Sequence, residues 1–208
     1  MATEGETNGA LEAVVLAGGA GARFGGGKLT HPWLGGVLID GALTAAFAAP
    51  ARSVTLVTGA DAKVADAARA FAARIGEASR LSIVHCGDHV EGMGASLRAG
   101  IAALPPDAAG AFVFLGDMPL VPAAVLPRLA AALAAGAPAA APTFRGQRGH
   151  PVLFAAALFP QLRTLGGDQG AREVLRALGD ELVLVEAPDD GVLIDIDHPR
   201  DLDAAADR

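Results

Sequence analysis

Residues 13 to 28 read Ala13-Val-Val-Leu-Ala-Gly-Gly-Ala-Gly-Ala-Arg-Phe-Gly-Gly-Gly-Lys28, a short apolar run that passes directly into a glycine-rich loop. An apolar run of this length, bounded by glycine, predicts a strand buried on both faces, which is typical of a parallel sheet. Open α/β sheets bind their ligands at the carboxyl ends of such strands. The loop is therefore predicted to border a ligand site.

Similar apolar runs alternate with Ala-rich stretches along the rest of the chain. Strands are predicted at 53–58, 81–85 and 111–116, and helices at 61–74, 94–104 and 122–135. Shorter elements follow Pro138: strands at 139–143, 151–154, 182–186 and 192–196, a helix after Gly170 and a last helix from Pro199. This order predicts the α/β class, as a three-layer α/β/α Rossmann-like fold whose mostly parallel sheet has an antiparallel piece.

The composition excludes several classes of protein. The chain has 208 residues, and we expect one domain over 11–208 after a disordered tail at 1–10. Although 52% of residues are hydrophobic, no run approaches the roughly 18 to 20 apolar residues of a membrane span, and no secretory signal is present, so we expect a cytoplasmic protein. A net charge of −7 without a basic run argues against nucleic-acid binding. The single cysteine, Cys86, favours a small buried hydrophobe over a redox or zinc site.

The glycine-rich loop is best explained as a triphosphate-binding loop. A Walker A motif fails, because Ala22 replaces its first glycine and Leu29 replaces the hydroxyl residue after Lys28. The dinucleotide fingerprint fails, because Phe24 stands at its third glycine and no acid ends the second strand. Arg23 and Lys28 are cations that can offset phosphate charge, while glycines allow close approach of the backbone.

Two groups of carboxylates are candidate metal ligands. Asp117 ends the predicted strand at 111–116 and faces the same crevice as the loop. Asp195 and Asp197 are two residues apart, so their side chains share one face of an extended segment. If the groups converge, they can hold Mg²⁺, which prefers oxygen ligands. As an alternative, Asp117 and Asp197 cap helices, the latter before His198-Pro199.

Three further segments are candidate binding loops. Gly92-Met-Gly-Ala-Ser96 opens a predicted helix, so Ser96 either caps that helix or offers its hydroxyl to a nucleobase. His150 precedes a proline and is therefore extended, which either directs it at a ligand or ends a turn. Gly167-Asp-Gln-Gly-Ala-Arg172 begins another helix that can hold an anion, with Asp168 as its alternative cap.

Several of these motifs together resemble one family. The Leu-Ala-Gly-Gly-x-x-x-Arg-Phe-Gly motif from Leu16, followed by Lys28, is similar to the signature of the nucleotidyltransferases that attach CMP or GMP to the molybdenum cofactor. It is more distantly similar to that of sugar-phosphate nucleotidylyltransferases. Gly116-Asp-Met-Pro119 resembles the family's metal-binding motif, and Asp195-Ile-Asp-His-Pro-Arg-Asp-Leu202 resembles its closing motif. The resemblance covers residues 13–205.

The resemblance implies a magnesium-dependent transfer of a nucleoside monophosphate from CTP or GTP to molybdopterin or the molybdenum cofactor, with release of pyrophosphate. A recipient molybdoenzyme is an implied partner. Catalytic roles are implied for Arg23, Lys28 and Asp117, and metal contacts for Asp117, Asp195 and Asp197. The implied nucleotide contacts are Leu16, Ala17, Gly18, Gly19, Arg23, Lys28, Gly92, Met93 and Ser96, and the implied acceptor contacts are His150, Gln169, Gly170 and Arg172.

The choice of base and acceptor stays open. The cytidylyl branch generally carries Leu-Ala-Ala-Gly in the loop, whereas Gly18 matches the Leu-Ala-Gly-Gly of the guanylyl branch, and the later motifs favour the cytidylyl branch. Residues 29–41 depart from the family pattern. Three other functions remain: a nucleotidyltransferase for another phosphorylated acceptor, a nucleotide-sugar glycosyltransferase that uses Asp195 and Asp197, and a non-catalytic carrier of the cofactor.

Overall fold

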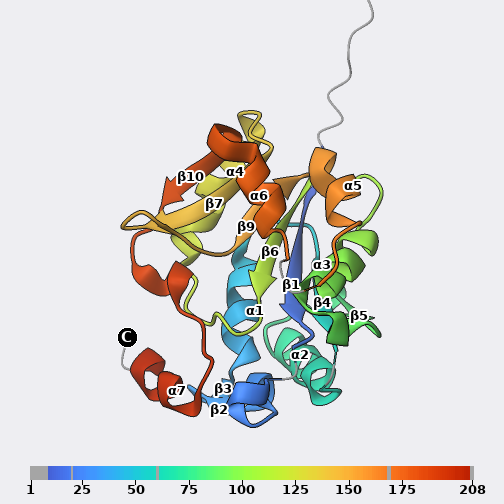
Figure 1. The fold of residues 1–208 in the computed structure, drawn as a ribbon. Coiled ribbons are helices and arrows are strands. Elements are labelled where there is room, and N and C mark those ends of the chain that lie inside the picture. Colours follow the sequence, from blue (N-terminus) through green and yellow to red (C-terminus); the bar gives the residue numbers. More distant parts are fainter. Residues whose placement is uncertain (1–8, 20, 60, 168–169, 207–208) are drawn as a thin grey trace, which may run out of the picture.

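A central mixed sheet organises the computed structural model, which describes residues 9–19, 21–59, 61–167 and 170–206 (Figure 1). The eight-stranded sheet has the order β10-β7-β9-β6-β1-β4-β5, with β8 paired to β7. Its strands are β1 (Leu11–Ala17), β4 (Val54–Thr58), β5 (Leu81–His85), β6 (Gly110–Leu115), β7 (Ala139–Phe144), β8 (Gln147–Arg148), β9 (Val152–Ala155) and β10 (Leu182–Glu186). A separate antiparallel hairpin joins β2 (Pro32–Trp33) to β3 (Gly36–Val37).

In the main sheet, four of the seven described strand pairs are parallel. Strand β1 pairs in parallel with β4 and β6, β4 with β5, and β7 with β10. Strand β9 runs antiparallel to both β6 and β7. The prediction of a mostly parallel α/β sheet with an antiparallel piece is confirmed. Of the tail predicted at 1–10, residues 1–8 lie outside the described residues.

Helices cover both faces of this sheet (Figure 1). Alternate side chains of β1 enter two different cores, Val15 on one face and Val14 on the other, as the period of a strand requires. The helices on the Val15 face are α1 (Ile39–Ala48), α2 (Lys63–Arg74), α4 (Leu126–Ala134) and α7 (Pro199–Ala206), and those on the Val14 face are α3 (Met93–Ala102), α5 (Phe159–Leu162) and α6 (Arg172–Leu178). The predicted three-layer arrangement is therefore confirmed. No helix in the described part of the chain is long and apolar enough to cross a membrane.

The strand predicted at 192–196 is wrong. Residues Asp190–Leu193 form the 3₁₀ helix η8, and residues 194–197 join no strand. The carboxylate of Asp189 accepts a hydrogen bond from the Gly191 amide at 2.9 Å, which closes a turn directly before the predicted strand, and the 3₁₀ helix η8 continues from that turn to Leu193. The segment therefore runs across the end of the sheet, where the Ile196 amide donates to the Asp117 carbonyl.

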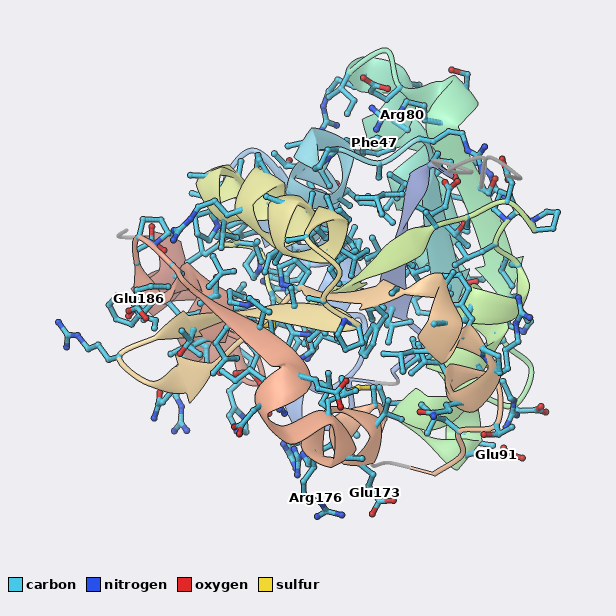
Figure 2. All side chains as sticks on the ribbon, turned by 90° about the horizontal axis from the view of Figure 1, so that it is seen from above. Phe47, Arg80, Glu91, Glu173, Arg176 and Glu186 are labelled. Carbon is cyan, nitrogen blue, oxygen red and sulfur yellow. The ribbon has the colours of Figure 1, made fainter. Side chains whose placement is uncertain are left out.

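Other elements also differ from the prediction, α1 and β5 among them. Helix α1 has no predicted counterpart, because residues around most of its circumference are buried and the amphipathic period is weak. Strand β5 is not buried on both faces: it ends the sheet, and Ser82 and His85 are exposed. Arg80, just before this edge strand, lies 5.6 Å from the ring centroid of Phe47 and ties the edge to α1 (Figure 2).

Candidate functional site

The glycine-rich loop follows β1 but does not lead directly into a helix. It passes through the 3₁₀ helices η1 (Ala22–Phe24) and η2 (Lys28–Thr30) and the β2–β3 hairpin before α1 begins at Ile39. Gly21, Gly25, Gly26 and Gly27 all have positive φ angles, which a residue with a side chain rarely adopts. The loop can therefore bind phosphate through its own amides and cations, and not through the amino end of a long helix.

Side chains from three distant segments meet at the carboxyl ends of β1 and β6. Lys28 Nζ donates to Asp117 Oδ2 at 2.7 Å and to Asp197 Oδ1 at 3.4 Å. Arg23 Nη1 donates to Asp197 Oδ2 at 2.8 Å. The Lys28 side chain is 11% exposed and that of Arg23 is 75% exposed. The lysine pairs are therefore less screened by solvent, whereas the arginine can reorient at little cost.

These carboxylates border a cavity of about 540 Å³. Asp117, Asp195 and Asp197 all line it, so the sequence prediction that the acids converge agrees with the geometry. The remaining lining residues are Leu16, Gly18, Gly19, His89, Val90, Gly92, Met93, Ser96 and Leu115. Of the other predicted nucleotide contacts, Ala17 packs into the core on the Val15 face of the sheet and does not line the cavity. Arg23 and Lys28 do not line it either, but they form ion pairs with Asp197 and Asp117, which do.

The alternative roles as helix caps do not fit these positions. Asp117 precedes no helix, because the next helical element, η5 (Ala123–Val125), begins six residues later. The amides of Asp197 and His198 donate to the Asp201 carboxylate at 3.0 and 2.7 Å. The side chain that accepts hydrogen bonds from the backbone at the start of α7 is therefore that of Asp201 and not that of Asp197. These bonds hold the pKa of Asp201 below its ordinary value.

The electrostatic environments of Asp195 and Asp197 differ. Loss of solvation raises the pKa of Asp195, and the nearby charges of Asp117 and Asp197 raise it further. Burial also opposes ionisation of Asp197, but its bonds to Arg23 and Lys28 outweigh this and lower its pKa. Among the described residues, no group of three or more acidic, His or Cys side chains is arranged to hold a metal as it stands. Lys28 lies between Asp117 and Asp197 instead.

Ser96 lies inside α3 and does not cap it, because the helix begins at Met93. It is 5% exposed and lies behind the glycine-rich loop. A Cβ atom placed on Gly18 would be 2.6 Å from Ser96 Oγ, which is closer than real Cβ contacts. Gly18 therefore lets the loop approach the hydroxyl of Ser96 directly.

The start of α3 also contacts the segment before α6. The Gly94 amide donates to the Gly167 carbonyl at 2.9 Å, so it is not free for a ligand. A Cβ on Gly94 would be 2.8 Å from the Gly166 backbone. Only glycine fits at position 94 without displacing this segment, and the predicted base-binding and acceptor-binding regions are thereby held together.

A second cavity of about 280 Å³ shares Leu16, Met93 and Leu115 with the first. His150 and Arg172, both predicted acceptor contacts, line it. Gly170 lies beside Met93 and does not line the cavity, and Gln169 is outside the described residues. Arg148, Gly149, Val152, Phe154, Ala171, Leu175, Leu97 and Val113 complete the lining.

Sequence reasoning missed several lining residues, among them His89, Val90 and Arg148. His89 and Val90 belong to η4 (His89–Glu91), which follows β5, and the Val90 side chain is 83% exposed beside the first cavity. The loop after the strand predicted at 81–85 lies at the same edge of the sheet as the glycine-rich loop, and that position is a signal that could have been used. Arg148 was missed because its two-residue strand has no hydrophobic period. The prediction that Cys86 is buried near a strand end is confirmed.

The chain belongs to the MobA-like NTP transferase domain family, whose sequence profile matches residues 13–182. The fold described above is thus that of a member of a nucleotidyltransferase family. The purine catabolism protein PucB of Bacillus subtilis is 37% identical over 129 residues, a match that covers 60% of this chain and 60% of PucB. The molybdenum cofactor cytidylyltransferase of Escherichia coli is 26% identical over 96% of this chain and 97% of its own length.

Solved structures have the same fold. The Mycobacterium tuberculosis protein Rv0371c superposes with a TM-score of 0.77 at 24% identity, covering 96% of this chain and 99% of its own. A nucleotidyl transferase from Methanothermobacter gives 0.74 at 24% identity, covering 95% of this chain and 96% of its own. Molybdopterin-guanine dinucleotide biosynthesis protein A from Archaeoglobus fulgidus superposes with a TM-score of 0.64 at 20% identity, covering 94% of this chain and 97% of its own.

Proposed function

We propose that the protein transfers CMP from CTP to the phosphate of molybdopterin or the molybdenum cofactor, with a divalent metal, and releases pyrophosphate. The observation that carries this proposal is the convergence of two loop cations on carboxylates that line one cavity. Further support comes from the match over nearly the full length of a molybdenum cofactor cytidylyltransferase. A recipient molybdoenzyme is the expected partner for the product.

The nucleotide fits the first cavity with its triphosphate over the glycine-rich loop. Arg23 and Lys28 supply the positive charge that the triphosphate needs, in a chain whose net charge is −7. The base then lies against Gly92, Met93 and Ser96, which line the same cavity. Ser96 Oγ has both a donor and acceptor capacity and is directed at Gly18, so it can contact the edge of a base.

The carboxylates offer oxygen atoms, which are suitable ligands for a divalent metal. Asp117, Asp195 and Asp197 offer the hard oxygen ligands that Mg²⁺ prefers, on the wall of a cavity large enough for waters and phosphate. A bound Mg²⁺ would neutralise phosphate charge at this position. Magnesium is the proposed metal in the cell.

The reaction requires no general base from the chain. A phosphate monoester has a second pKa of about 6 and is largely ionised near neutral pH, so it can attack the α-phosphorus directly. The new phosphoanhydride bond forms as the bond from the α-phosphorus to its bridging oxygen breaks, and pyrophosphate leaves with that oxygen. The chain contributes by positioning both substrates and by neutralising charge with Lys28 and Arg23.

GTP is the second nucleotide to consider, on one specific observation. Gly18 matches the Leu-Ala-Gly-Gly of the guanylyl branch, and a methyl group at this position would meet Ser96 Oγ at 2.6 Å. The residue at position 18 therefore bears on the hydroxyl that is proposed to contact the base. Two other candidates also fit parts of the site: a nucleotidyltransferase for another phosphorylated acceptor, and a carrier that binds the cofactor without consuming nucleotide.

The decisive experiment compares CTP, GTP, ATP and UTP in a thermal-shift assay with and without Mg²⁺, together with a pyrophosphate-release assay with molybdopterin. Ligand at about 100 times its dissociation constant stabilises a protein by roughly 2.7 kcal/mol, which is readily detected. A Mg²⁺-dependent shift and pyrophosphate release with CTP support the proposal. A shift with GTP alone assigns the guanylyl reaction. If none of the four triphosphates shifts the melting temperature, even in the presence of acceptor, the result contradicts nucleotidyl transfer.

A further inference from the structure

Arg98 lies on α3 and joins two distant segments of the chain, although it lines neither cavity. Its Nη1 atom donates to the Leu165 carbonyl at 3.0 Å. Its Nη2 atom donates to Asp88 Oδ2 at 3.3 Å and to Glu91 Oε2 at 3.4 Å. The two carboxylates belong to the turn after β5 and the carbonyl belongs to the segment after α5, so a single guanidinium holds both segments against α3.

The turn that carries the two carboxylates forms part of the wall of the first cavity. His89 and Val90 line that cavity and lie between Asp88 and Glu91 in the chain. Glu91 itself extends to the periphery of the molecule (Figure 2). An exposed ion pair contributes little alone, but Arg98 contacts the turn at both of its ends. The contacts of Arg98 therefore fix the position of the side chains between them.

The segment that carries the carbonyl leads to the wall of the second cavity. Leu165 packs against the core on the Val14 face of the sheet, and Arg172, farther along the chain, lines the cavity. The Gly94 amide holds the same segment through its bond to the Gly167 carbonyl. Gly94 and Arg98 are four residues apart and so lie on one face of α3. The helix therefore holds this segment at two points, one of which is the Arg98 side chain.

Arg98 also compensates negative charge beside the first cavity. Within the described ranges, it is the one cation that forms an ion pair with Asp88 or with Glu91. Its side chain is 33% exposed, so solvent weakens these pairs without abolishing them. Without Arg98, two uncompensated carboxylates would border the cavity in a chain whose net charge is −7, and they would repel an anionic ligand.

We propose that Arg98 is a positioning residue for both substrates: it fixes and neutralises the turn beside the nucleotide, and it fixes the segment at Leu165 that leads to the acceptor. The assignment of nucleotide and acceptor to the two cavities rests on the proposed function. The joining of the two segments does not, because it follows from the three hydrogen bonds of the guanidinium.

Steady-state kinetics of Arg98→Met test the effect on each substrate. Initial rates of pyrophosphate release give separate KM values for CTP and for molybdopterin. The KM for CTP should rise about fivefold, because two partly screened carboxylates lose their cation. The KM for molybdopterin should rise about tenfold, the effect of one lost hydrogen bond to a carbonyl. The kcat should be nearly unchanged, because the pairing of Lys28 with Asp117 is not touched.

A triple variant separates the two roles of Arg98. Arg98→Met is combined with Asp88→Asn and Glu91→Gln, which remove the uncompensated charges. The KM for CTP should then return toward the native value, whereas the KM for molybdopterin should stay high because the Leu165 carbonyl still lacks its donor. A general loss of folding would not be relieved for one substrate alone. The inference is overturned unless Arg98→Met raises both KM values and the triple variant restores only that for CTP.

Hydrogen exchange tests the joining of the segments without catalysis. The Gly94 amide reports its bond to the segment after α5, and the Glu91 amide reports the turn after β5. Both amides should exchange faster in Arg98→Met than in the native protein. Arg69→Met is the matched control, since it removes a helical arginine that pairs with an aspartate but lines neither cavity, and both amides should exchange in it as in the native protein.

The exchange data also separate this inference from the proposed function. Unchanged exchange at either amide in Arg98→Met overturns the inference. If the native protein releases no pyrophosphate but both amides exchange faster in Arg98→Met, the proposed nucleotidyl transfer is rejected and the joining role of Arg98 stands.

Discussion

Lys28 Nζ lies 2.7 Å from Asp117 Oδ2, so a lysine of the glycine-rich loop already neutralises the strand-end carboxylate that is proposed to hold a divalent cation. The same ammonium group is 3.4 Å from Asp197 Oδ1. A triphosphate over the loop offers Lys28 an alternative anion. Binding of nucleotide and binding of metal should therefore favour each other, because each removes a charge that competes with the other.

We expect Mn²⁺, as a spectroscopic substitute for Mg²⁺, to bind at least fivefold more tightly in the presence of CTP than in its absence, within the usual range of coupling between sites. Lys28→Met should strengthen Mn²⁺ binding to the free protein and reduce this coupling, since the competing ammonium group is gone. Electron paramagnetic resonance of free Mn²⁺ gives both affinities. Lys63→Met is the matched control, because Lys63 lies on α2 and makes no ion pair with a described residue. Equal Mn²⁺ affinity in native and Lys28→Met protein would contradict this role of Lys28.

Asp117→Ala should lower turnover by about two to three orders of magnitude, which corresponds to a loss of roughly 3 to 4 kcal/mol of transition-state stabilisation. The reason is that Asp117 lies at the junction of the loop cations and the cavity. Initial rates of pyrophosphate release measure the effect, with circular dichroism as the check of folding. Unchanged turnover would remove Asp117 from the proposed metal site.

Gly18→Ala should destabilise the protein by about 1–3 kcal/mol, the usual cost of overpacking, because the new methyl group would meet Ser96 Oγ at 2.6 Å. In the double variant with Ser96→Ala, most of this loss should be recovered, since the distance from the new methyl group to the Ser96 Cβ is an ordinary 3.6 Å. Urea unfolding of the four proteins in a double-mutant cycle measures the coupling. Additive effects of the two substitutions would show that the two side chains do not meet.

The free energy of unfolding should depend on pH through His150. Burial lowers its pKa below the ordinary value of 6.5, so the unfolded chain binds a proton at a higher pH than the folded chain does. The contribution of the neutral His150 ring to the free energy of unfolding is therefore fully present above pH 6.5 and is lost as the pH falls from there through the folded pKa. The charges that face the ring, Arg148 and Asp117, act in opposite directions, Arg148 lowering the pKa and Asp117 raising it.

Urea unfolding of native protein and His150→Gln between pH 8 and 5 tests this dependence. The native protein should lose more stability than the variant over the acidic part of the range, because His31, His85, His89 and His198 are present in both. Parallel stability profiles would mean that His150 is not the buried neutral group described above.

The class of fold could be predicted from the sequence because the central strands are buried on both faces. The apolar run from Ala13 to Ala17 in β1 and the apolar residues of β6 predict a parallel sheet without any tertiary information. The same reasoning failed for residues 192–196. Their apolar and β-branched residues are typical of a strand, but Asp189 closes a turn at Gly191, and a turn that depends on one side-chain bond is not visible in the pattern of hydrophobicity.

The sequence by itself determined the sheet, the position of the glycine-rich loop after β1 and the acid that follows β6, because these depend on burial and on residues adjacent in the chain. Only the tertiary structure decided which distant groups meet. The pairing of Lys28 with Asp117 joins residues 89 apart, and that of Arg23 with Asp197 joins residues 174 apart. The contact of Gly18 with Ser96 and the burial of His150 likewise depend on how the chain crosses the sheet, which no local pattern of residues specifies.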